Sequence, residues 1–258
     1  MSSNHERILD QFTRQAVPFA SASSIRNREA LDRIVRMAEA GPTDTVLDVA
    51  SGPGLLVCAF AKVVAHATGI DLTPAMLEQS RREQQQQGLE NISWQQGDVS
   101  TLPFPDESFS IVSARFAFHH FPDPASVLRE MRRVCKTGGC VVVADSAPAP
   151  EKAAAFNAVE KLRDPSHVRA MPESELVDLF RDAGFIELRT DRYRLPGELE
   201  DLLRRSFPNE GDADRIRKIF ANSLSGDAID MATNLHDGKI GFAFPVAILA
   251  GRKNPAGR

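Results

Sequence analysis

The sequence predicts an α/β fold, with a doubly wound, mostly parallel sheet covered by helices on both faces. Two observations predict it: short apolar runs alternate with helical patterns from residue 45 to residue 145, and the first three runs each end close to a carboxylate. Such alternation implies crossover connections, which join parallel strands. We expect residues 1–258 to form a single domain, because this length suits one α/β unit with a substantial core.

The apolar periodicity places the strands and helices of this region. The expected strands are residues 45–49, 67–70, 92–95, 110–114 and 140–144, and the expected helices between them are residues 55–64, 74–87 and 125–134. Ahead of them, residues 1–40 are expected to form N-terminal helices that end at Gly41-Pro42. Gly138-Gly139 is interpreted as the turn into the fifth strand.

The pattern changes after residue 145. Helices are expected at residues 151–163 and 172–183, and two further strands at residues 185–195 and 242–252. Residues 196–241, which separate those strands, are too many for a hairpin turn and rich in helix formers. We interpret them as a helical insertion, either a lid over a substrate pocket or a dimer element. A surface extension without such a role is the alternative.

Composition limits the classes of partner. With 31 basic and 35 acidic residues the chain lacks the basic excess typical of nucleic-acid-binding proteins, so no nucleic acid partner is expected. Cys58, Cys135 and Cys140 lie inside apolar runs and are interpreted as reduced thiols rather than disulfides or metal ligands. Neither a secretory signal nor a membrane-spanning run is recognisable, which predicts a cytoplasmic protein.

A glycine-containing turn follows the first expected strand and narrows the choice of ligand. A dinucleotide-binding loop needs a small residue in its third glycine position, and here that position holds Val57. Asp48 lies four residues before Gly52, where its charge would repel a diphosphate. A ligand that carries an ammonium group and no phosphate suits this loop better, which disfavours nicotinamide-dependent oxidoreduction.

The motifs of residues 46–145 resemble those of class I S-adenosylmethionine-dependent methyltransferases, of the small-molecule type that includes the ubiquinone and menaquinone C-methyltransferases. The resemblance is carried by residues 47–54, 69–77, 97–99, 102–110 and 119–124, and by the stretch from Leu128-Arg129-Glu130 through Gly139. It implies seven strands, with the last inserted antiparallel, and S-adenosylmethionine as cofactor. The cofactor-binding residues expected from it are Asp48, Ala50, Gly52, Gly54, Asp71, Leu72, Met76, Asp98, Val99 and Arg115.

The resemblance also implies roles within that set. Asp48 and the glycines would face the methionine amine and the ribose side, and Asp98 and Val99 would contact adenine. Asp71, at the end of the second apolar run, would accept hydrogen bonds from the ribose hydroxyls. Simpler interpretations stay open: Asp71 as the cap of the helix beginning near Pro74, Asp98 as a turn residue, and Arg115 in a structural ion pair rather than at a carboxylate.

Three histidines are the candidate catalytic residues. His119 and His120 follow the fourth strand, at the carboxyl edge where open sheets bind ligands, and His167 lies in a polar segment after an apolar helix. Histidine titrates in the range useful to a general base. The alternatives are packing or capping roles for the pair, and a loop capped by Asp164 and Ser166 around His167. Further acceptor-side candidates, or lining residues of an apolar pocket, are Asp145, Tyr193, Phe12, Phe19 and Phe116.

The expected function is transfer of a methyl group from S-adenosylmethionine to a small, partly apolar or aromatic metabolite, with oxygen, nitrogen or carbon as acceptor, in a biosynthetic pathway. The alternative is a cofactor-binding scaffold that catalyses cyclisation or rearrangement without methyl transfer. No Ser-His-Asp grouping or metal-ligand spacing is present, which disfavours hydrolases and metalloenzymes, and no metal is expected. The expected partners are the small-molecule substrate and, through the insertion, a second copy of the chain.

Overall fold

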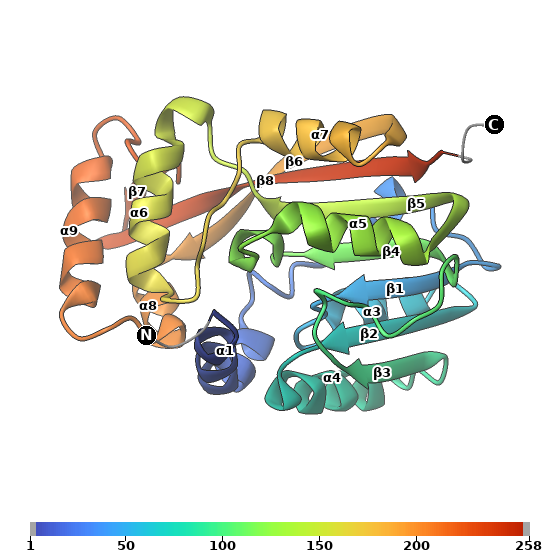
Figure 1. Ribbon diagram of the computed structural model, residues 1–258. Coiled ribbons are helices and arrows are strands. Elements are labelled where there is room, and N and C mark those ends of the chain that lie inside the picture. The colour runs from blue at the N-terminus through green and yellow to red at the C-terminus, as the bar shows by residue number, and fades with distance from the viewer. Residues whose placement is uncertain (1–3, 255–258) are drawn as a thin grey trace.

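A twisted sheet runs through the middle of the protein in a computed structural model that describes residues 4–254 (Figure 1). The strand order is β3 (Ile92–Gln96), β2 (His66–Asp71), β1 (Thr45–Val49), β4 (Phe109–Arg115), β5 (Cys135–Ser146), β8 (Lys239–Lys253) and β6 (Phe185–Glu198). Strands β1 to β5 pair in parallel, and β8 is antiparallel to both of its neighbours. The predicted fold class is confirmed, while residues 1–3 and 255–258 of the predicted domain lie outside the described residues.

Two details of the strands differ from the expectation. β7 (Asn234–His236) forms a short hairpin with β8 through Asp237 and Gly238, which both have positive φ and suit a tight primed turn. β5 begins directly after α5 (Pro124–Val134), so Gly138-Gly139 lies inside the strand rather than before it. The pairing with β4 is irregular there, and Gly138 takes a φ of 74°.

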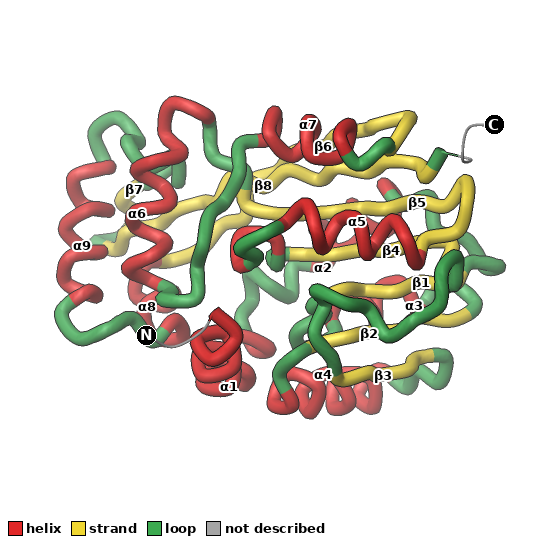
Figure 2. The backbone as a smooth tube through the Cα atoms, viewed as in Figure 1, coloured by secondary structure: helices red, strands yellow, loops and turns green. Residues whose placement is uncertain are grey.

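Helices cover both faces of the sheet (Figure 2). Neighbouring residues of a strand point to opposite faces, so Val46 packs in one core and Leu47 in the other. The Val46 core includes residues of α2 (Arg28–Met37) and α3 (Leu55–Ala61), and the Leu47 core includes residues of α5 and α7 (Glu173–Asp182). α4 (Pro74–Gln87) packs beside α3 and β3. These cores fix the strand ends at which the site lies.

The expected helical insertion is present beyond the ends of β6 and β8. α8 (Leu199–Ser206) and α9 (Asp212–Ser223) join α6 (Ala153–Arg163), which follows the short η2 (Pro150–Lys152), in a third core. Because β6 runs to Glu198, which pairs with Gly241, and β8 begins at Lys239, the insertion is shorter than residues 196–241. Its role as a lid or dimer element stays a prediction.

The N-terminal helix α1 (Asn4–Ser21) lies close to the carboxyl ends of β1 and β2 (Figure 1). Two of its buried side chains, Gln11 and Gln15, donate hydrogen bonds to the carbonyl oxygen of Ser206 at the end of α8, with N···O distances of 2.5 and 3.0 Å. α1 therefore connects the insertion to the carboxyl edge of the sheet. No helix in the described part of the chain is both long enough and apolar enough to cross a membrane.

Candidate active site

A cavity of about 370 Å³ opens at the carboxyl edge of the sheet, within the size range of small-molecule sites. Its walls come from the ends of β1, β2 and β4, from the loop after β3, from α1 and from η1 (Phe118–His120). The predicted cofactor residues on these walls are Asp48, Ala50, Gly52, Asp71, Leu72, Met76, Asp98, Val99 and Arg115. The sheet therefore brings residues spread over three strands to one surface.

Asp48 is a buried carboxyl group on the floor of this cavity. The hydroxyl of Ser113 donates to its Oδ1 over 2.6 Å. Burial raises the pKa of Asp48 to about 7, although the Ser113 hydrogen bond and the positive charge of Arg115 act in the opposite direction. An ammonium group placed beside Asp48 would restore its charged form, so the site favours a cationic ligand.

Asp71 is held by the turn that follows β1. The backbone N–H of Gly52 donates to its Oδ2 at 2.7 Å, and the N–H of Thr73 donates to its Oδ1 at 2.8 Å. Burial raises the pKa of Asp71, and these two hydrogen bonds oppose the shift. Thr73 takes the N-cap position of α4 with Pro74 behind it, so Asp71 supports the turn and presents its carboxylate to the cavity.

Gly54 is the one predicted cofactor residue that does not line the cavity. A Cβ atom at this position would lie 2.5 Å from a ring carbon of Trp94 and 2.7 Å from Cβ of Ser80. The glycine is therefore needed for close packing of α4 and β3 against the turn, and its expected contact with the cofactor stays a prediction. Gly52, by contrast, has a φ of 52° and no described atom within 4 Å of an added Cβ.

The position of Asp98 is compatible with both roles that the sequence left open. Its Oδ1 accepts a hydrogen bond from the N–H of Ser100 at 2.9 Å, as a turn residue does, while its side chain lies on the cavity wall. Its Oδ2 lies 3.2 Å from Nε2 of His5 on α1. Sequence reasoning missed His5, because a histidine on a polar helix carries no spacing signal.

Two groups on the walls have polar atoms with no hydrogen-bond partner among residues 4–254. One is the buried hydroxyl of Ser51. The other is Arg115, whose Nη1 donates to the carbonyl oxygen of Ile25 at 3.0 Å while its buried Nε and Nη2 have no hydrogen-bond partner within that range. The side chain of Tyr193 lies close enough to this guanidinium to oppose the lowering of its pKa by burial. Buried polar atoms are normally satisfied, so these atoms indicate a ligand with oxygen acceptors. Together with Asp48 and Asp71, the residues fit an amino acid bearing a ribosyl group.

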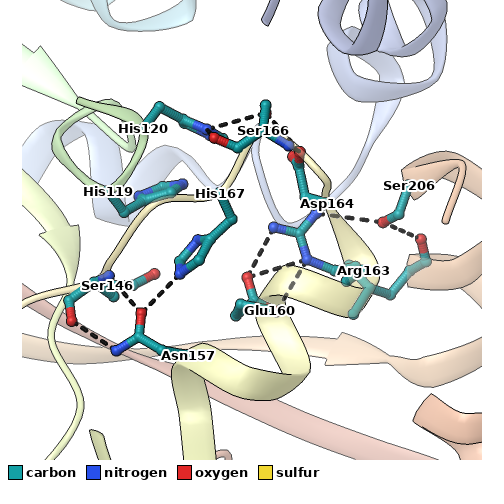
Figure 3. A network of polar contacts seen from close by, with 12 residues as sticks. His119, His120, Ser146, Asn157, Glu160, Arg163, Asp164, Ser166, His167 and Ser206 are labelled. Atoms are coloured by element: carbon teal, nitrogen blue, oxygen red, sulfur yellow. Dashed lines mark hydrogen bonds and ion pairs between the residues drawn. The ribbon is translucent and has the colours of Figure 1, made fainter. Parts of the chain in front are cut away.

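The three candidate histidines form a cluster next to this cavity (Figure 3). The ring centres of His119 and His120 are 4.2 Å apart, and those of His119 and His167 are 5.3 Å apart. Asp145 holds His119 by two contacts, Nδ1 to Oδ1 at 2.5 Å and the backbone N–H to Oδ2 at 3.1 Å. Burial alone would lower the pKa of His119, but the Asp145 carboxylate outweighs it and the pKa is raised.

The pKa values of His120 and His167 shift in the opposite direction from that of His119. Burial and the charge of His119 lower the pKa of both rings, so both are neutral. Nδ1 of His120 donates to the carbonyl oxygen of Ser166 at 3.2 Å, and Nε2 of His167 donates to Oδ1 of Asn157 at 2.7 Å. The N–H and hydroxyl of Ser166 donate to Asp164, as the capped-loop interpretation requires.

A second, smaller cavity of about 70 Å³ adjoins the first. The two share wall residues, which include Phe12, Phe19, Phe116 and His120, so these aromatic candidates do line a pocket. His119 lines the smaller cavity, whereas His167 is behind it and appears on neither wall. Of the other candidates, Asp145 acts through His119, and Tyr193 packs against the sheet core.

Comparison with known proteins places this geometry in a family. Residues 47–143 match a family model described as a methyltransferase domain. The uncharacterised methyltransferase YcgJ of Bacillus subtilis is 31% identical over 249 residues, which cover 94% of this chain and 97% of that protein. The chain belongs to the S-adenosylmethionine-dependent methyltransferases. The crystal structure of YcgJ superposes on this methyltransferase with a TM-score of 0.81. The superposition covers 89% of this methyltransferase and 100% of the YcgJ chain.

Two further proteins are similar to this methyltransferase, one in part of its sequence and one in its fold. The demethylmenaquinone methyltransferase of Chlorobaculum parvum is 40% identical over 99 residues, which cover 38% of this methyltransferase and 39% of that enzyme. The crystal structure of the [4+2]-cyclase SpnF is 21% identical in sequence and superposes with a TM-score of 0.59. The superposition covers 88% of this chain and 81% of the SpnF chain. That second likeness concerns the fold alone.

Proposed function

We propose that this methyltransferase methylates a small, partly apolar or aromatic metabolite in a biosynthetic pathway, at an oxygen, nitrogen or carbon acceptor. The observation that carries the proposal is the pair of adjoining cavities at the carboxyl edge. The larger has carboxylates suited to an ammonium group and ribose hydroxyls, and the smaller has phenylalanine rings beside a histidine. Two reactants of different chemistry can thus lie next to each other.

The residues of the larger cavity are proposed to hold S-adenosylmethionine, which supplies a methyl group already activated by its sulfonium centre. Asp48 would bind the ammonium group, and Arg115 the carboxylate. Asp71, fixed by two backbone N–H groups, would accept from the ribose hydroxyls. Asp98 and Val99 would contact the adenine ring from the loop after β3. The unpaired atoms of Ser51 and Arg115 support this assignment, because a bound ligand would satisfy them.

The acceptor side needs orientation, exclusion of water and, for some acceptors, removal of a proton. We propose that His119 removes this proton from the acceptor. Asp145 holds Nδ1 of His119, so Nε2 is the atom that can take a proton when the ring is neutral. His120, neutral and on both cavity walls, would orient the acceptor. His167 would support this pair from behind. A base is required only for acceptors that are protonated at neutral pH.

Two measurements test the proposal. Titration calorimetry with S-adenosylhomocysteine should give a dissociation constant in the micromolar range, and Asp71→Asn should weaken it by about tenfold or more, because a charged acceptor is lost. Asp178→Asn is the control, because this side chain is 66% exposed on α7, outside both cavities. Methyl-labelled S-adenosylmethionine offered with extracts of small metabolites should label a product. Absence of both binding and label transfer would end the proposal, and label transfer separates it from a scaffold that moves no methyl group.

A further inference from the structure

The smaller cavity has walls of mixed chemistry. Phe12, Phe19 and Phe116 line the part that it shares with the larger cavity. The other walls carry charged side chains of α6 and α8 together with neutral residues such as Leu195, Leu202 and Phe244. Its volume of about 70 Å³ is half of the roughly 150 Å³ that admit a benzene ring. There is room at the charged end for a polar group of a few atoms, but not for a ring.

Most charges at this end already have partners. The guanidinium of Arg163 lies 2.8 Å from Oε2 of Glu160 and 3.8 Å from Oδ2 of Asp164, and its Nη1 is 3.5 Å from the hydroxyl of Ser206 (Figure 3). Two acidic residues thus compensate one buried arginine. Neither carboxylate makes an ion pair with the second cation of this wall, although the charge of Glu160 raises the pKa of that cation.

Arg205 is that second cation. Its side chain is 11% exposed, its Nη2 donates to the hydroxyl of Ser24 at 3.2 Å, and its buried Nε has no hydrogen-bond partner in the described chain. Asp201 lies 3.6 Å from this Nε, but that carboxylate is 47% exposed and also accepts a hydrogen bond from Arg204. Burial and the neighbouring Arg163 lower the pKa of Arg205, while the charges of Asp201 and Glu160 act in the opposite direction.

We propose that the smaller cavity binds a carboxylate group of the acceptor, and that Arg205 is the residue that binds it. The apolar or aromatic body of the acceptor then lies among the shared phenylalanines, directed toward the larger cavity. The acceptor is therefore an apolar or aromatic carboxylic acid. This inference rests on the proposed function, because it assumes that the larger cavity holds the cofactor and that the acceptor extends from the shared phenylalanines into the smaller one.

The test measures binding rather than turnover. Protein saturated with S-adenosylhomocysteine is titrated with benzoate, phenylacetate and 3-phenylpropionate, which present a carboxylate at three distances from the ring, and with the three corresponding amides. At least one carboxylate should bind about tenfold more tightly than its amide, as expected for a charge-assisted hydrogen bond in a buried site.

Three variants identify the residue responsible. Arg205→Met, which keeps an apolar stem, should remove the preference for the carboxylate, and Arg205→Lys should keep part of it. Arg204→Met is the matched control, because that neighbouring side chain is 72% exposed, and it should leave the preference unchanged. Binding of S-adenosylhomocysteine and the thermal midpoint establish that each variant is folded.

Each outcome decides one question. If all three carboxylates bind no better than their amides, or if the preference survives in Arg205→Met, the inference is wrong. If the wild-type protein binds no S-adenosylhomocysteine, the proposed function fails first. If Arg205→Met does not fold, the comparison of Arg205→Lys with the wild type decides, since a preference that is identical in both and insensitive to salt would also contradict the inference.

Discussion

Replacing Asp48 by asparagine should make the ligand-free protein more stable and the cofactor complex weaker. The side chain keeps its shape, and its Oδ1 can still accept the hydrogen bond from Ser113. What changes is the charge. In the native protein burial raises the pKa of Asp48 from 3.8 to about 7. The native state therefore holds a proton that the unfolded chain releases between these two pH values.

The sign and size of the effect follow from this difference. A carboxyl group with a raised native pKa destabilises the fold as pH rises above 3.8, and the cost reaches its full value above about pH 7. About three pH units at about 1.4 kcal/mol each give a cost of about 4 kcal/mol at pH 8. Asp48→Asn removes it, so the stability advantage of the variant should be largest at pH 8 and shrink toward pH 5.

Urea denaturation of both proteins without ligand, at pH 8 and at pH 5.5, measures this advantage. Calorimetry at pH 8 should show S-adenosylhomocysteine binding weakened by about tenfold or more in Asp48→Asn, because the ammonium group loses its counter-charge. Asp178→Asn serves again as the control. An Asp48→Asn protein that is no more stable than the wild type at pH 8, or that binds the ligand equally well, would refute this account of the site.

Three further predictions follow from other contacts. Asp145→Asn should lower the pKa of His119, which a carbon-labelled histidine NMR titration can follow; an unchanged pKa would show that Asp145 does not set it. Gly54→Ala should cost about 2 to 4 kcal/mol, since it adds a steric clash to a left-handed φ, whereas Gly52→Ala should cost about 1 to 2 kcal/mol. Equal losses in urea denaturation would contradict that comparison. Phe220→Ala should cost about 3 to 5 kcal/mol but leave S-adenosylhomocysteine affinity unchanged, because the ring packs in the insertion core and lines neither cavity; a parallel loss of affinity would count against this separation.

Sequence reasoning could place the proposed cofactor residues at one edge of the sheet, because local rules decide where the strands end. Asp48 and Asp71 belong to neighbouring parallel strands, and parallel strands end at the same edge of a sheet. Gly54 shows the limit of such reasoning. A glycine needed for close packing and one needed for ligand access look identical in sequence, and only the position of Trp94 distinguishes them.

The acceptor side depends on contacts between distant segments, so it was predictable only in part. The histidines could be proposed singly, but the approach of His167 to His119 results from how the chain returns after β5. Arg205 lies in the insertion and reaches Ser24, which is 181 residues away in sequence. Neither periodicity nor a motif marks such a contact, because tertiary packing alone creates it.

Helix α1 separates both cavities from solvent. It contributes walls to both cavities and is attached at two points to different parts of the protein: Asn4 donates to the carbonyl oxygen of His120 at 3.1 Å, and Gln15 donates to that of Ser206. Displacing this one helix would open both cavities to solvent together. With the proposed reactants bound there, a mutation that loosens α1 should speed the exchange of the acceptor and of the spent cofactor alike.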